Sequence, residues 1–138
     1  MTTTRILALG AFAAALVSGG SACGSEDPGG TGVTTPGPIT VSLTTPSRDD
    51  GALLLVVTGS GFTGATATST ANTLVWRRVS DTETRVAVVG NIVNGPLFTV
   101  EAPEGTAASA FTAAVSEVAD RADAVRASTT GYSLSVSR

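Results

Sequence analysis

Short apolar segments, separated by glycine, proline and aspartate, make up most of the chain from Ile39 to Arg138. At the start of this region Ile39, Val41 and Leu43 alternate with hydroxyl residues, which is the period of a half-buried β-strand. A continuous apolar run follows over residues 52–58, and its length is that of a strand rather than a helix. We expect this run to be a central strand of a sheet.

Further strands are expected after residue 72. Residues 73–79 and 84–89 read as two strands joined by a four-residue connection, which is typical of a hairpin. Leu74 and Trp76 share one face of the first strand, but the pattern does not say which face is the core. Proline is tolerated mainly at sheet edges, so Pro96 predicts a short edge strand over residues 97–100.

Residues 111–126 fit two patterns. Phe111, Val115, Val118, Ala122 and Val125 recur at helical spacing, while the first part of the segment also alternates as a strand does. We expect a strand to about residue 117 and a helical turn or loop over residues 120–127.

About seven short strands predict an all-β fold, a single antiparallel β-sandwich that spans residues 39–138. Three segments carry a family resemblance: the apolar strand after the Asp-Asp-Gly turn (residues 49–57), residues 85–95 leading into Pro96, and residues 111–120. Together they resemble the cohesin-like jelly-roll sandwiches of secreted bacterial proteins. The resemblance implies contact with a protein or a glycan, and it brings no catalytic residues.

The N-terminal residues predict export. Arg5 precedes an apolar run over residues 6–17, and small residues follow up to Cys23, the only cysteine. This is the layout of a secretory signal peptide, here residues 1–22. A membrane-spanning helix needs about 20 apolar residues, so the run is too short to remain as an anchor.

Gly20, Ser21, Ala22 and Cys23 resemble the lipobox of bacterial lipoproteins. The resemblance implies that Cys23 becomes the acylated N-terminus, carrying chains such as palmitate that attach the protein to the membrane. In a cell with two membranes it also implies the outer membrane, because Gly24 is not the aspartate associated with inner-membrane retention. The alternatives are ordinary secretion with Cys23 as a free thiol, and an uncleaved signal that stays as an anchor.

Residues 23–38 contain mostly glycine, proline, serine and threonine after the cysteine, a composition that cannot bury enough apolar surface to fold. We interpret this segment as a flexible linker between the lipidated Cys23 and the sandwich.

Charge and residue types argue against several classes of function. The chain after residue 22 has seven arginines and eleven carboxylates, and this negative balance disfavours nucleic acid as a partner. The chain has no histidine, the commonest general base and metal ligand, so neither an enzyme nor a bound cofactor is expected. Asp120 and Asp123 are the only candidate pair of catalytic carboxylates. They would share a face only on a helix, and there we interpret them as solvent-exposed surface residues.

Two pairs of residues are the candidates for ligand contact. Asp49 and Asp50 could contribute to a calcium site, although two adjacent carboxylates are too few alone and solvated turn residues would look the same. Trp76 and Tyr132 could form an aromatic surface for sugars, although Trp76 also fits a core position. The leading hypothesis is an envelope lipoprotein with a structural or protein-interaction module. The alternative is an exported module that binds glycans or calcium.

Overall fold

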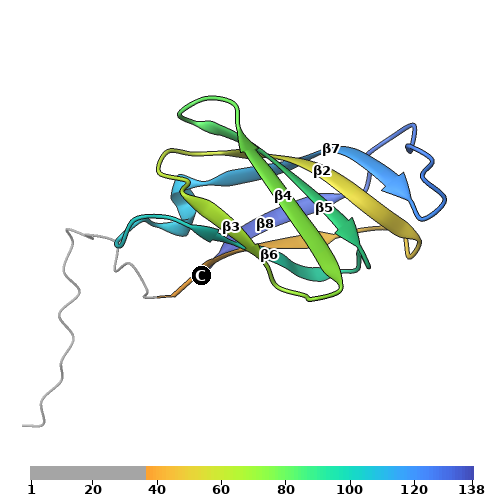
Figure 1. Ribbon diagram of the computed structural model, residues 1–138, viewed down its shortest axis with the longest axis horizontal. Helices are drawn as coiled ribbons and strands as arrows, with labels where there is room; N and C mark the ends of the chain where they lie inside the picture. Colours follow the sequence, from red (N-terminus) through yellow and green to blue (C-terminus); the bar gives the residue numbers. More distant parts are fainter. Residues whose placement is uncertain (1–36) are drawn as a thin grey trace, which may run out of the picture. The chain divides into compact units, whose positions relative to one another are not determined.

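The computed structural model describes residues 37–138. The predicted signal peptide, Cys23 and all but the last two residues of the predicted linker lie outside the described residues. In the described part the fold is all-β, with two four-stranded antiparallel sheets packed face to face, so the predicted β-sandwich is confirmed (Figure 1).

Each sheet takes strands from both halves of the domain. In sheet A the strands lie in the order β3 (Gly64–Ala67), β6 (Gly95–Glu101), β1 (Ile39–Thr44) and β8 (Ser133–Ser137). In sheet B the order is β4 (Asn72–Arg78), β5 (Glu83–Gly90), β2 (Asp50–Thr58) and β7 (Thr112–Asp120). A short 3₁₀ turn, η1 (Ala108–Ala110), precedes β7.

The pairing of the strands follows a simple rule. β1 pairs with β8, β2 with β7, β3 with β6 and β4 with β5, all antiparallel. These are the pairs of one long hairpin folded over on itself, which is how an eight-stranded jelly-roll sandwich is built. The pairs β1 with β6 and β2 with β5 then complete the two sheets.

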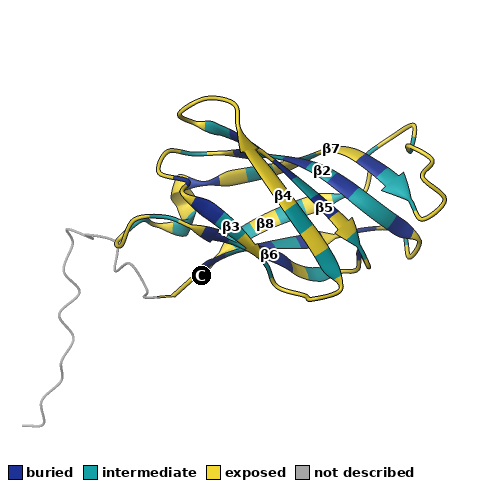
Figure 2. Cartoon of the chain, in the orientation of Figure 1, coloured by how far each residue is buried: buried dark blue, intermediate teal, exposed yellow. Residues whose placement is uncertain are grey.

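The core lies between the sheets and contains fifteen buried apolar residues of the described part. Leu53, Leu55 and Val57 point inward from β2, as strict alternation requires. β2 has a neighbour on each side, which confirms the predicted central strand. Figure 2 shows the dark-blue buried positions alternating with lighter ones along the strands. Every second residue of a strand faces the other sheet, so apolar residues that alternate along the sequence all point into the core.

The prediction of an edge strand after Pro96 is wrong. β6 lies between β3 and β1 in sheet A. Pro96 is tolerated there because β3 pairs with β6 only as far as Phe98, and because the register with β1 shifts at Leu97. Pro96 still pairs with Ser42 of β1, but it lies beyond the β3 pairing and beside the bulge at Leu97, a position where strands tolerate proline.

Residues 111–126 are strand and loop. β7 extends to Asp120, beyond the predicted end, and residues 121–127 contain no helix. The neighbouring residues Leu55 and Leu54 of β2 pair with Val115 and Glu117 of β7. Ser116 between them has no partner and forms a β-bulge. The bulge lets Val115 and Val118 share the inner face three residues apart, a spacing that imitates a helix.

Candidate functional site

A buried carboxylate lies at one end of the sandwich, where β2 begins. Asp50 is fully buried, and its carboxylate accepts hydrogen bonds from Thr45 Oγ1 at 2.7 Å, Arg126 Nε at 2.8 Å and the Tyr132 hydroxyl at 2.9 Å. Arg126 and Tyr132 both come from the segment between β7 and β8. The network thus ties the turn before β2 to the last quarter of the domain.

A second bulge explains why Asp50 points inward. The register between β2 and β7 shifts at Gly51, whose added Cβ would lie 2.9 Å from the Asp120 carbonyl oxygen. Strict alternation from Leu53 would put Asp50 on the outer face, but the extra residue reverses its side. The glycine after the aspartate was the only local sign of this in the sequence.

Asp49 is exposed, in contrast to its neighbour. Its carboxylate accepts a hydrogen bond from Arg126 Nη2 at 2.5 Å and another from the Ser47 hydroxyl. The Ser47 bond and then the Arg126 bond lower the pKa of Asp49 below its ordinary value. The hydrogen bond to Asp50 raises the pKa of Arg126. Arg126 therefore bridges one buried and one exposed carboxylate.

Protein donors already occupy this cluster. The Tyr132 pKa is raised by burial and by the hydrogen bond to Asp50, so the phenol stays a donor at neutral pH. Among the described residues no group of three or more histidine, cysteine, aspartate or glutamate side chains could hold a metal. The hydrogen bonds of Asp50 hold segments of the fold together, and calcium binding at Asp49 and Asp50 stays a prediction.

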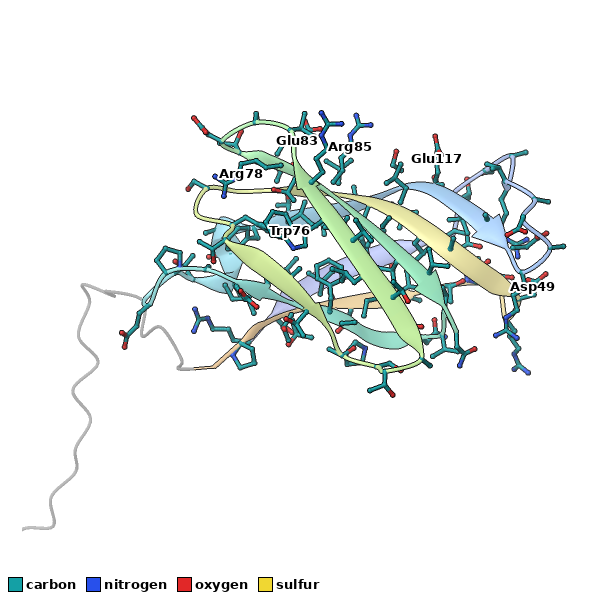
Figure 3. The ribbon with its side chains drawn as sticks, viewed as in Figure 1. Asp49, Trp76, Arg78, Glu83, Arg85 and Glu117 are labelled. Carbon is teal, nitrogen blue, oxygen red and sulfur yellow. The ribbon has the colours of Figure 1, made fainter. Side chains whose placement is uncertain are left out.

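The two predicted sugar-contact residues are not brought together. Tyr132 contacts Asp50, whereas Trp76 lies on β4 with its ring edge against Phe62, at 5.3 Å between ring centroids. Figure 3 shows Trp76 well away from Asp49, which marks the carboxylate end. Trp76 is on the inner side of β4 but remains 39% exposed, because β4 is an edge strand. It is neither a fully buried core residue nor part of a two-ring surface.

The outer face of sheet B is the most unusual surface of the described residues. Val75, Val89 and Val125 are 64%, 52% and 67% exposed, and Leu54 and Val56 are half-buried beside them. The pairing places Val75 beside Ala87 and Ala87 beside Leu54, so the apolar side chains are continuous across three strands. A shallow apolar groove crosses this face between β5 and the end of β7, lined in part by Val89, Ala119 and Val125.

The outer face of sheet A provides the comparison within the same molecule. In register across its four strands lie Thr66, Thr99, Thr40 and Ser137, all hydroxyl residues. Ser42 and Ser135 form the next pair on this face. An antiparallel sheet normally has polar residues on its solvent face, as sheet A does. The apolar outer face of sheet B departs from that rule, and such patches mark interaction surfaces.

Charged side chains flank the apolar centre of this face. Arg77 on β4 and Arg85 on β5 are directly paired across the strands, and Glu117 stands on β7 at the opposite side. Figure 3 shows Glu83, Arg85 and Glu117 projecting from the same side of sheet B, away from sheet A. Glu83 lies 3.7 Å from Arg85, an exposed ion pair of small energetic value.

Comparison with known proteins does not assign the chain to a family. No family model matches it, and no curated protein or solved structure gives a significant match. The resemblance to cohesin-like modules and to lipoproteins therefore stays a prediction. Within residues 37–138, no helix is long and apolar enough to cross a membrane.

Proposed function

We propose that this protein is a membrane-anchored envelope lipoprotein whose β-sandwich is a protein-interaction module. The observation that carries the proposal is the apolar outer face of sheet B, where large exposed valines lie in register with half-buried leucine and alanine. Exposed apolar surface of this kind is unfavourable in water, and covering it with a partner removes that cost.

The anchor in this proposal is the lipid on Cys23. Support comes from the sequence: a short apolar run after Arg5, then Ser21 and Ala22 directly before the single cysteine. Two or more acyl chains on that residue would give stable attachment, whereas one chain is marginal. The linker that follows would let the sandwich reach partners at a distance of about 20 Å from the lipid.

A binding role fits the polar groups better than a catalytic one. The one fully buried carboxylate of the described residues, Asp50, makes its hydrogen bonds to Thr45, Arg126 and Tyr132 within the fold. A general acid or base needs an open position for substrate, whereas the carboxylate of Asp50 is fully buried.

The anchor is tested by intact mass measurement of the protein from a bacterial envelope, beside a Cys23→Ser variant. The expected mass is that of a chain beginning at Cys23 plus diacylglycerol and acyl groups, and the variant should lack the added mass. Cleavage without added lipid would contradict the anchor and leave a secreted domain.

The interaction role is tested by affinity purification from detergent-solubilised envelope. Ala87→Glu places a charge at the centre of the apolar face, and Ser135→Glu is the matched control on the outer face of sheet A. We expect at least about tenfold lower recovery of co-purifying proteins with Ala87→Glu, because a buried unpaired charge is costly. Equal recovery from both variants would contradict an interaction through this face.

A further inference from the structure

We infer that β4 binds an extended segment of another protein as an added strand at its free edge, with a carboxylate of that segment beside Arg77. β4 is an outermost strand of sheet B, and in the described part of the chain it pairs only with β5 (Figure 1). The inference rests on the proposed function as a protein-interaction module and names the kind of partner. A segment held at this edge also brings the rest of its protein to the apolar outer face of sheet B, which β4 borders.

The other three sheet edges of the described residues are short or covered. β3 has four residues and β8 has five. β7 has nine residues, but the bulge at Ser116 interrupts it, and the loop that follows covers its last part, where the Arg126 N–H donates to the Val118 carbonyl at 2.8 Å. Proteins commonly protect sheet edges in these ways. β4 has seven residues in regular register with β5, and no bulge or described segment protects its other side.

The free edge of β4 presents backbone groups in the pattern of an unfilled ladder. The Val79 N–H donates to the Glu83 carbonyl at 2.8 Å, and in an antiparallel pair such hydrogen-bonded positions alternate with non-hydrogen-bonded ones. The N–H and C=O groups of Leu74, Trp76 and Arg78 therefore point away from β5. Within residues 37–138 these groups have no backbone partner. An extended chain has donors and acceptors at the same spacing, about 6.8 Å along the strand, so the segment that fits this edge is itself a strand.

Side chains on the outer side of β4 define the sequence of the segment. Arg77 lies directly opposite Arg85 of β5, and within the described residues it makes no hydrogen bond or ion pair. Like charges in that position are destabilising, and a carboxylate on the other side of Arg77 offsets the repulsion. Val75 and Val79, two residues before and after Arg77, are 64% and 53% exposed. The segment therefore carries an acidic residue between two apolar residues, each two positions away from it.

The same features argue against two other occupants of this edge. A second copy of β4 would add arginines rather than carboxylates, and charged edges resist pairing with like-charged strands. In residues 24–36 of the chain itself the only carboxylates are Glu26 and Asp27, and the only large apolar residue is Val33. Neither sequence contains an acidic residue with apolar residues two positions before and after it.

Photo-cross-linking of the full chain in intact cells tests the inference by its register. A photoreactive residue is placed at Val75 or at Val79, and the attachment sites on the captured protein are mapped by mass spectrometry. The two positions lie about 14 Å apart along the strand, so an added strand gives attachment sites about four residues apart in one segment, with aspartate or glutamate between them. A helix lying along β4 would give sites about nine residues apart, because its rise per residue is smaller.

Neutral substitutions of the two paired arginines provide a matched comparison. Arg77→Gln should lower recovery of the captured protein in affinity purification at least about fivefold, because the charged hydrogen bond to the segment is lost. Arg85→Gln removes the same charge one strand farther from the edge, and recovery should stay within about twofold of that with the unmodified chain.

The outcomes separate the added strand from the interaction module. Attachment sites at helical spacing, in separate segments or in a second copy of this chain would overturn the added strand, as would the absence of adducts or equal recovery from the two arginine variants. If Ala87→Glu still lowers recovery in such a case, the interaction module stands and its partner covers the face in another way. Equal recovery from Ala87→Glu and Ser135→Glu, with attachment sites in strand register, would instead contradict the face and leave the edge of β4 as the interaction site.

Discussion

Asp50→Ala removes the acceptor on which side chains from three parts of the domain converge. Hydrogen bonds to a charged group contribute about 1.5–3 kcal/mol each, and Thr45, Arg126 and Tyr132 all donate to this carboxylate. Arg126 is 28% exposed and keeps its bonds to Ser47 and Asp49, so part of this loss is recovered by solvent and by the remaining partners. We expect the free energy of unfolding to fall by about 3 kcal/mol, a large share of the 5–15 kcal/mol of a typical domain.

Urea unfolding of the full chain, followed by the fluorescence of the single tryptophan, measures this change. With a slope of about 1.5 kcal/mol per molar urea, the midpoint should fall by about 2 M. Asp49→Ala is the matched control, because Asp49 bonds the same arginine from an exposed position. Its midpoint should match that of the unmodified chain. Equal effects at the two aspartates, or a shift under about 0.5 M for Asp50→Ala, would refute the assigned role of the buried carboxylate.

Three further predictions concern the folded domain. The raised pKa of Tyr132 means that the folded state holds the phenolic proton more tightly than the unfolded state does, so this contribution to stability is complete below pH about 10 and is lost as the pH rises through the folded pKa. In urea titrations between about pH 9.5 and 11.5, Tyr132→Phe should therefore lose less stability than the unmodified chain. Identical pH profiles for the two proteins would contradict this. The sequence has no lysine, which keeps that pH range free of other side-chain titrations. Phe98→Ala should lower the free energy of unfolding by about 3–5 kcal/mol, since the ring is fully buried, and a loss under about 1 kcal/mol would argue against its core position. Gly90→Ala should lower the melting temperature more than Gly95→Ala. Both glycines have positive φ, but an added Cβ at Gly90 would lie 2.2 Å from the Ala71 carbonyl oxygen, whereas one at Gly95 would meet nothing within 4 Å. A larger loss for Gly95→Ala would contradict this geometry.

The regular strands could be predicted from the sequence because their core contacts follow the period of two. Ile39, Val41 and Leu43 are all buried on β1, and the expected hairpin is present as β4 and β5. Local patterns are sufficient where one face of a strand is buried and no residue is inserted.

The errors and omissions occur where a bulge or a distant contact decides the outcome. The bulge at Ser116 converts a strand period into helical spacing, and β6 lies between two strands although it contains a proline, with a bulge at Leu97 beside that proline. The bond between Arg126 and Asp50 joins residues 76 positions apart, and the sequence contains no local signal for it. Pairing of this kind is fixed by topology, which a single sequence does not reveal.

Local sequence patterns also could not locate the candidate surface, the outer face of sheet B. The sequence showed apolar residues on both faces of residues 52–58, which is typical of a strand buried on both sides. The structure covers the inner face only, and Leu54 and Val56 remain on an outer face that Val75 and Val89 extend. The apolar excess in the sequence was therefore a sign of an exposed apolar face, our proposed interaction surface, that only the arrangement of the sheets locates.

Site-specific photo-cross-linking in intact cells tests most directly whether the outer face of sheet B is the interaction surface of the protein. A photoreactive residue is placed at Val89 on the outer face of sheet B, or at Ser135 on the outer face of sheet A as the control. We expect a discrete protein adduct from position 89, either a second copy or another envelope protein, and none from position 135. Adducts of equal yield from both positions, or none from position 89, would contradict an interaction through the outer face of sheet B.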